Sequence, residues 1–298
     1  MRLTGLLFFP DTTKLLIILA VATSFGGSAS AATFTSSLAD AQWLVKASVF
    51  ECSLSHPIAT YGSAVFARRA GEAEIFRLHQ KKQVLPAGNA ELLAVAPRWN
   101  GDQTPVPMGG VEVVAGDEPI RLDAARAHQL QSVLEEGRRL IFLRHADPVG
   151  QAAVRVILEP IHFRAGIQAY RDCISHLLPV NFNQIERTAV YFPETANSLS
   201  AAESRKLDVL IRYVKADKRV NKIYIDGHTD SEGVRPENLE VSKTRAELIA
   251  VYLTEHGIPE DNLVTRWHGE RYPVASNKTP AARAQNRRVT LRLERGKT

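Results

Sequence analysis

The hydrophobic pattern of this 298-residue chain changes near residue 180, and this change constrains the fold more than any other feature. Before that point, short apolar segments alternate with polar residues at period two and are separated by Gly, Pro and Asn. Such a pattern is typical of antiparallel β structure. After it, short strand-like segments alternate with longer segments whose apolar residues recur at helical spacing. The sequence therefore predicts an α+β protein with two differently built domains, at 32–180 and 181–298.

The first domain is predicted to be an antiparallel β-rich open barrel or sandwich that one main helix interrupts. Its strand segments are "WLVKASVFECSLS", "SAVFARRAG", "AEIFRLHQ", "ELLAVAP", "GVEVVAG", "RLIFLRH" and "AAVRVILEPIHF". The helix is expected over 122–137, with Asp123 near its start and Gly137 as a stop signal. A second short helix, "GIQAYRDCISHLL", is expected to carry Cys173.

The second domain is predicted to follow the order strand, helix, strand, helix, strand, strand, with the helices on one face of the sheet. Strands are expected at "TAVYFP", "NKIYIDGH", "NLVTRWHG" and "RRVTLRLE". Helices are expected over 200–216 and from about Asn238 to His256, where apolar residues recur at helical spacing.

Residues 1–31 have the pattern of a secretory signal peptide. Lys14 precedes the apolar run Leu15–Phe25, and small residues surround a cleavage site after Ala31. The run is much shorter than the roughly 20 apolar residues that cross a bilayer. No later stretch is apolar for long enough to do so. We therefore expect an exported mature chain without a membrane span.

Cys52 and Cys173 are the two cysteines of the chain. In an oxidising compartment, an even pair most simply forms a disulfide. In the chain-entropy model, a disulfide that closes the long loop between these two cysteines contributes about 4–5 kcal/mol to the stability of the fold. The alternatives are a zinc pair of Cys52 with His56, or a nucleophilic Cys52. Neither a C-x-x-C spacing nor a positioned partner supports them.

The charge of the chain does not indicate a nucleic-acid partner. Lysine and arginine number 37 against 32 aspartate and glutamate, which gives a net charge of +5, and the charges are scattered along the chain. A mildly basic balance alone does not define a nucleic-acid surface. We expect no nucleic-acid partner, no metal and no cofactor.

The segment "HTDSEGVRPENLEVSKTRA", residues 228–246, is the candidate binding segment. It follows a strand that ends at Gly227 and contains a turn with Asp230 before a helix for which Asn238 is the expected N-cap. Arg245 lies about two helical turns further on, so it is expected on the same face, pointing toward the turn. An acid and a planar guanidinium would then flank a pocket suited to a zwitterion.

Three other interpretations of this segment are open at the sequence level. Asp226, His228 and Asp230 alternate along the strand end and could hold a metal ion. Ser231 with His228 and Asp230 matches a hydrolase triad by composition, without a nucleophile elbow. Asp230 and Arg245 could also form a structural ion pair within the turn.

Five linked motifs of the second domain resemble a known family. They are "IDGHTDSEG", "NLEVSKTRA", "YLTEHGIP", "WHGERYPVASNKT" and "ARAQNRRV", in the order and nearly at the distances of OmpA-like peptidoglycan-binding domains. The resemblance implies a βαβαββ fold that binds the diaminopimelate-containing stem peptide of the cell wall without covalent chemistry. It also implies that Asp230 and Arg245 hold the ligand and that Thr229 and Asn238 contribute beside them.

The chain departs from the OmpA-like pattern at the rim of the expected pocket. Where the family usually has a G-x-G-E element, this chain has "WHGE", so Trp267 and His268 replace the first glycine region. Arg283 and Arg287 are interpreted as support for the pocket, with a solvated basic face as the alternative.

The segment "SVFECSLSHPIATYGSAVFARRAGE", followed by "AVAPRW", resembles the N-terminal domain of the MotY family of periplasmic flagellar-motor proteins. This resemblance implies that the β-rich domain attaches to the flagellar basal body and to a MotX-like partner protein, forming a ring, the T ring, that recruits stator units. It also implies that the cysteines matching Cys52 and Cys173 pair.

Together the two resemblances imply a non-enzymatic periplasmic protein that anchors a basal-body ring and its stator units to peptidoglycan. One alternative is a general OmpA-like envelope-integrity protein without a flagellar role. The other is an envelope enzyme, such as a wall amidase or carboxypeptidase, that uses the region of His228.

Overall fold

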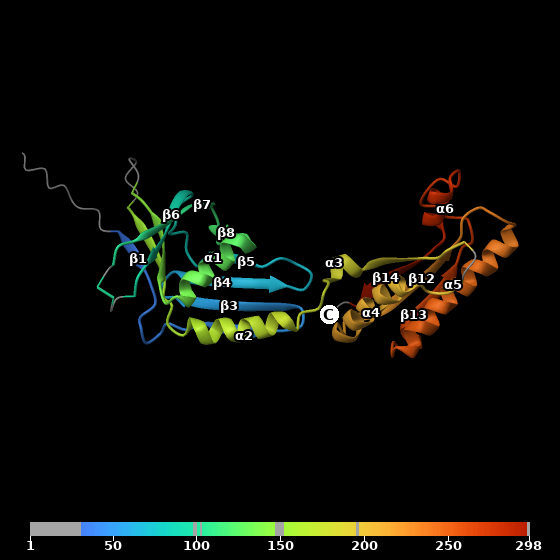
Figure 1. The fold of residues 1–298 in the computed structure, drawn as a ribbon, viewed down its shortest axis with the longest axis horizontal. Helices are drawn as coiled ribbons and strands as arrows, with labels where there is room; N and C mark the ends of the chain where they lie inside the picture. The colour runs from blue at the N-terminus through green and yellow to red at the C-terminus, as the bar shows by residue number, and fades with distance from the viewer. Residues whose placement is uncertain (1–30, 98–99, 102, 147–151, 195–196, 297–298) are drawn as a thin grey trace, which may run out of the picture.

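The computed structural model describes residues 31–97, 100–101, 103–146, 152–194 and 197–296. The predicted signal peptide lies outside the described residues, apart from its last residue. Figure 1 shows an elongated molecule with a β-rich N-terminal part at one end and a helix-covered sheet at the other. None of the helices in the described ranges combines the length and apolar character needed to cross a bilayer.

Two five-stranded sheets build the N-terminal part. Their strand orders are β1-β10-β9-β6-β7 and β2-β3-β4-β5-β8. Among the strand pairings described for these two sheets, only that of β1 with β10 is parallel. The predicted β-rich domain is confirmed, with the described strands in two separate sheets and not in a closed barrel. The strands are β1 (Ala32–Phe34), β2 (Leu44–Ala47), β3 (Glu51–Ile58), β4 (Gly62–Arg69), β5 (Ile75–Gln80), β6 (Gly88–Val95), β7 (Val106–Val113), β8 (Ile120–Leu122), β9 (Arg139–Arg144) and β10 (Val154–Leu158).

Both sheets contribute to one apolar core. Phe76 of β5 and Phe142 of β9 come from different sheets and stack with ring centroids 5.7 Å apart. The predicted central helix is α1 (Ala124–Glu135), which Asp123 caps by accepting a hydrogen bond from the Arg126 backbone N–H at 2.9 Å.

A disulfide joins Cys52 of β3 to Cys173 of α2 (Phe163–Ser175), with 6.0 Å between the two Cα atoms. The predicted disulfide is thereby confirmed, and the zinc and nucleophile alternatives for Cys52 are wrong because its sulfur is in the bridge. The helix packs closely at Gly166, where an added Cβ would lie 2.8 Å from Trp43 Cβ.

The C-terminal part has one four-stranded sheet of order β11-β14-β12-β13, in which β12 and β13 are parallel. α4 (Ala201–Ala216) and α5 (Arg235–Glu255) pack on this sheet (Figure 1), so the predicted order of strands and helices is confirmed. The strands are β11 (Arg187–Tyr191), β12 (Val220–His228), β13 (Leu263–Trp267) and β14 (Arg288–Arg295). Three short helices were not predicted: α3 (Phe182–Ile185), the 3₁₀ helix η1 (Glu260–Asn262) and α6 (Pro280–Asn286).

α5 begins at Arg235, three residues before the predicted start at Asn238. Pro236 lies in its first turn, where proline is well tolerated because the first N–H groups have no intrahelical partner. The prediction that Asn238 caps the helix was wrong. Val234 is the N-cap, and the Asn238 backbone N–H donates to its carbonyl at 3.0 Å within the helix.

The two parts of the molecule meet where the residues just before β3 and just after β4 contact α4 and α3. Phe50 packs edge-on against Tyr213 of α4, with ring centroids 5.7 Å apart. Gln184 Nε2 of α3 donates to the Gly71 carbonyl at 3.0 Å. The junction therefore combines an aromatic contact with a hydrogen bond between the two parts.

Candidate functional site

The candidate site forms where β12 ends. β12 is an inner strand, and its neighbours β13 and β14 hold this end from both sides. Gly227 is required here because an added Cβ would lie 2.1 Å from the Ser242 carbonyl oxygen of α5. Just beyond, the Thr229 backbone N–H donates to the Gly269 carbonyl at 3.0 Å. The turn that carries Asp230 is therefore held against both α5 and the loop after β13.

Asp230 is 5% exposed and is held by two donors. Its Oδ2 accepts a hydrogen bond from Arg287 Nη1 at 2.7 Å, and its Oδ1 accepts from the Glu232 backbone N–H at 3.2 Å. Arg287 directly precedes β14, whose first residue, Arg288, is paired with His228 in the sheet. The antiparallel pairing of β12 with β14 thus brings Arg287 to the turn.

Arg245 is 2% exposed and reaches the loop after β11. Its Nε donates to Asn197 Oδ1 at 3.1 Å, its Nη2 donates to the Pro193 carbonyl at 3.2 Å, and its guanidinium lies over the Phe192 ring. Among the described residues, the ion-pair partner of Asp230 is Arg287 and not Arg245. The structural ion pair between Asp230 and Arg245 is therefore not formed.

Asp230, Arg245 and Arg287 nevertheless form one charged cluster. Burial lowers the pKa of the Arg245 guanidinium, the nearby Arg287 lowers it further, and Asp230 raises it. Two cations and one anion leave the cluster with one positive charge in excess. Because an unbalanced buried charge is costly, a carboxylate brought by a ligand would find a favourable position here.

Thr229 directly precedes Asp230, and Asn238 lies seven residues before Arg245 on α5. The Thr229 side chain is almost fully buried, yet its Oγ1 has no hydrogen-bond partner in the described part of the chain. Asn238 Nδ2 donates to Glu270 Oε2 at 2.7 Å. The hydroxyl of Thr229 is thus a buried polar group without a partner in the described chain, directly beside Asp230 in the sequence.

Arg283 contacts the same turn from α6. Its Nε lies 3.3 Å from Glu232 Oε1, and its Nη1 donates to the Asn277 carbonyl at 3.2 Å. Arg283 and Arg287 thus both contact the turn of residues 228–233, and their role in supporting a pocket stays a prediction.

His228 lies beneath the turn as a buried imidazole. Its Nδ1 has no partner among the described residues, and its ring stacks on that of His268 with centroids 5.1 Å apart. Burial lowers the pKa of His228 to about 4, with further lowering by Arg288 and His268 and an opposing effect of Asp226. His228 is therefore neutral at neutral pH.

The metal and hydrolase interpretations gain no support from this geometry. Within the described ranges, no group of three or more His, Cys, Asp or Glu side chains is placed to hold a metal. Asp226 is engaged by Arg266 at 2.6 Å and Asp230 by Arg287. Ser231 contacts Asn277 through its backbone N–H, and no hydrogen bond links it to His228.

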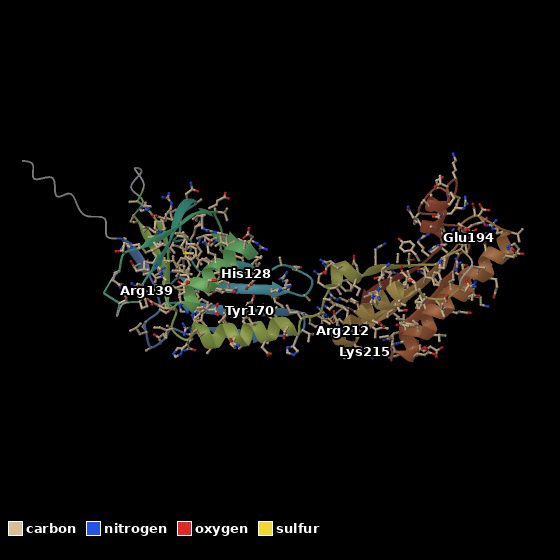
Figure 2. All side chains as sticks on the ribbon, in the orientation of Figure 1. His128, Arg139, Tyr170, Glu194, Arg212 and Lys215 are labelled. Atoms are coloured by element: carbon tan, nitrogen blue, oxygen red, sulfur yellow. A yellow bond between two sulfur atoms is a disulfide. The ribbon has the colours of Figure 1, made fainter. Side chains whose placement is uncertain are left out.

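The sequence motifs did not indicate the contribution of the loop after β11. This loop supplies Pro193 and Asn197 to Arg245, although they lie about fifty positions earlier in the chain. Glu194, labelled in Figure 2, marks this loop at the end of the C-terminal part remote from the N-terminal part.

Both parts of the chain have similar sequences among known proteins. Residues 34–179 match the MotY N-terminal domain, and residues 191–287 match the OmpA family. The sodium-type flagellar protein MotY of Vibrio parahaemolyticus is 28% identical over 257 residues, which cover 85% of this chain and 87% of that protein. The peptidoglycan-associated lipoprotein of Pseudomonas putida is 34% identical over 105 residues, covering 35% of this chain and 62% of that protein. The solved peptidoglycan-associated lipoprotein from Burkholderia pseudomallei is 29% identical, with a TM-score of 0.34, and covers 36% of this chain and 89% of that one.

The chain therefore joins a MotY N-terminal domain to a C-terminal domain of the OmpA family. Proteins of these families are structural and are not enzymes. The envelope-enzyme alternative is accordingly set aside.

Proposed function

We propose that this protein is a periplasmic component of the flagellar motor that anchors a basal-body ring and its stator units to peptidoglycan. The observation that carries the proposal is the buried charged cluster of Asp230, Arg245 and Arg287 at the end of β12 in a domain of the OmpA family. The chain that carries these charged groups begins with the pattern of a signal peptide, and its N-terminal domain matches MotY.

The expected ligand is the diaminopimelate-containing stem peptide, which carries ammonium and carboxylate groups. Asp230 is the acceptor for the ammonium group, and Arg245 is the donor to a carboxylate through its planar fork. Thr229 and Asn238 supply neutral polar contacts beside them. Each charge-assisted hydrogen bond of this kind contributes about 1.5–3 kcal/mol.

The flagellar role is supported by the extent of the likeness to MotY. The Vibrio relative covers 85% of this chain, including the N-terminal domain, whereas the peptidoglycan-associated lipoprotein covers 35%. A general envelope-integrity role would not explain why residues 34–179 match the N-terminal domain of MotY. In the proposed arrangement these residues bind the basal body and a MotX-like partner. The loop after β11, which Arg245 contacts, lies at the opposite end of the molecule, where Glu194 is labelled in Figure 2.

Co-sedimentation of the mature protein with purified peptidoglycan tests the anchor. We expect wild type to pellet with the sacculi and Arg245→Ala to stay largely in the supernatant. Arg212→Ala is the matched control, because Arg212 is an exposed arginine on α4 and is labelled in Figure 2 close to the junction. Equal pelleting of all three proteins would overturn the proposed site.

Complementation of a deletion strain tests the flagellar role. We expect the deletion to abolish swimming while filaments still assemble, and imaging of the basal body to show a missing periplasmic ring density. The Arg212→Ala gene should restore swimming, and the Arg245→Ala gene should not. Normal swimming of the deletion strain would instead favour the envelope-integrity role.

A further inference from the structure

A cleft of about 410 Å³ lies next to the charged cluster and is not part of it. Its first wall is the start of α5, with Arg235, Pro236 and Leu239. Its second wall is the end of β13 and the loop that follows, residues 267–271. The volume falls within the range typical of small-molecule sites, about 300–1,000 Å³.

The cleft combines an aromatic platform with charged groups. Trp267 is 41% exposed and Leu239 is 45% exposed, so both present apolar surface to the cleft. Lys243 lies over the Trp267 ring, 5.8 Å from its centroid. Arg235 and Arg271 add donors, and Glu270 adds acceptors, around the same opening.

The cleft and the charged cluster share a wall. Glu270 lines the cleft and accepts a hydrogen bond from Asn238, which lies on α5 together with Arg245. Gly269 also lines the cleft, and its carbonyl accepts from the Thr229 backbone N–H. Two hydrogen bonds therefore link the wall of the cleft to Thr229 and Asn238, the residues expected beside the stem peptide.

We infer that this cleft binds a pyranose ring of the peptidoglycan glycan strand, while the charged cluster binds the attached stem peptide. This inference rests on the proposed function. A pyranose has an apolar C–H face that packs on an aromatic ring, and its rim of hydroxyl groups both donates and accepts hydrogen bonds. Trp267 supplies the ring, and the arginines with Glu270 supply the partners.

Calorimetry on the full mature chain tests the inference with two matched ligands. The first is a stem tripeptide that contains diaminopimelate, and the second is the same tripeptide attached to its disaccharide. Wild type should bind the second roughly three- to tenfold more tightly, which corresponds to one aromatic stacking contact. Trp267→Ala should bind both ligands with the affinity that wild type has for the free peptide, and Trp267→Phe should keep part of the preference.

Tyr191→Ala is the matched control, because Tyr191 is an exposed aromatic residue on the opposite edge strand with Lys206 over its ring. It should keep the wild-type preference for the sugar-bearing ligand. Thermal unfolding of every variant shows whether a change in affinity reflects loss of the fold.

The calorimetry distinguishes failure of the proposed function from failure of the sugar subsite alone. If wild type binds neither ligand, the proposed function fails and the inference fails with it. If wild type binds both ligands equally, or Trp267→Ala weakens both equally, the sugar subsite is overturned and the stem-peptide site stands. If Arg235→Gln loses binding of the free peptide, the sugar subsite is also overturned, because the cleft then holds a carboxylate of the peptide. If Trp267→Ala keeps the wild-type preference for the sugar-bearing ligand, the sugar subsite is overturned, and a protein partner becomes the expected occupant of the cleft.

Discussion

Arg287 Nη1 lies 2.7 Å from Asp230 Oδ2, and the two side chains are 11% and 7% exposed. This ion pair is nearly buried, and Arg245 adds a second buried cation beside it. Asp230 therefore has two roles in the proposed mechanism, since it holds the turn closed and presents an acceptor to the ligand.

Asp230→Asn should destabilise the protein as well as weaken binding. The substitution removes the anion and leaves two arginines buried without compensation. We expect the free energy of unfolding, measured by urea denaturation, to fall by about 3 kcal/mol. Glu240→Gln removes the exposed ion pair with Lys243 and should change it by less than about 1 kcal/mol. Similar effects of the two substitutions would contradict the buried pair.

His228 should make stability depend on pH on the acid side of neutrality. Its pKa is about 4 in the folded chain and 6.5 ordinarily, so the unfolded chain binds more protons between these values. The free energy of unfolding should therefore fall as the pH is lowered from about 6.5 to 4. Urea titrations at several pH values should show a shallower dependence for His228→Asn. An unchanged slope would mean that His228 is not buried as a neutral ring.

Gly227→Ala should disturb the site more than its single methyl group suggests. The new Cβ would lie 2.1 Å from the Ser242 carbonyl oxygen, so α5 must move away from β12. We expect a loss of at least about 1 kcal/mol of stability, together with weaker peptidoglycan co-sedimentation. Gly137→Ala is a useful comparison, because nothing lies within 4 Å of an added Cβ there, although its positive φ adds strain. Wild-type binding by Gly227→Ala would show that the site tolerates this shift.

Reduction of the Cys52–Cys173 disulfide should lower stability without altering the binding chemistry. The bridge closes a separation of 121 residues, and its loss should cost about 2–5 kcal/mol. Thermal unfolding of Cys52→Ser/Cys173→Ser should show the lower midpoint, and addition of reductant should lower the wild-type midpoint toward it. Co-sedimentation below that midpoint should match wild type. Equal midpoints with and without the bridge would contradict this account.

Phe50→Ala should loosen the junction between the two parts of the molecule. The Phe50–Tyr213 contact is one aromatic pair, worth about 0.5–1.5 kcal/mol beyond its buried area. Small-angle scattering should show a broader distribution of shapes for the variant, while each part keeps its own fold. A distribution identical to wild type would mean that the remaining hydrogen bonds hold the junction.

Local patterns predicted the elements well where one rule dominated. Asp123 is a strong N-cap residue, and α1 starts where it predicts. Asn238 is an equally good N-cap residue, yet α5 starts earlier, because Arg235 and Pro236 already have helical conformation. The side chain of Asn238 instead donates a hydrogen bond to Glu270. A capping residue indicates a helix start only when its side chain has no better partner elsewhere in the fold.

The amino-acid sequence by itself determined the change from β-rich to mixed structure, the disulfide pair and the presence of Asp230 and Arg245 near one turn. These features depend on local periodicity, on composition and on motif spacing. The tertiary structure decided which cation Asp230 contacts, because strand order places Arg287 beside it across 57 positions of chain. It also decided that Arg245 binds the loop after β11. Hydrophobic patterning specifies which face of an element is buried, and only the pairing of the strands specifies which buried charges become neighbours.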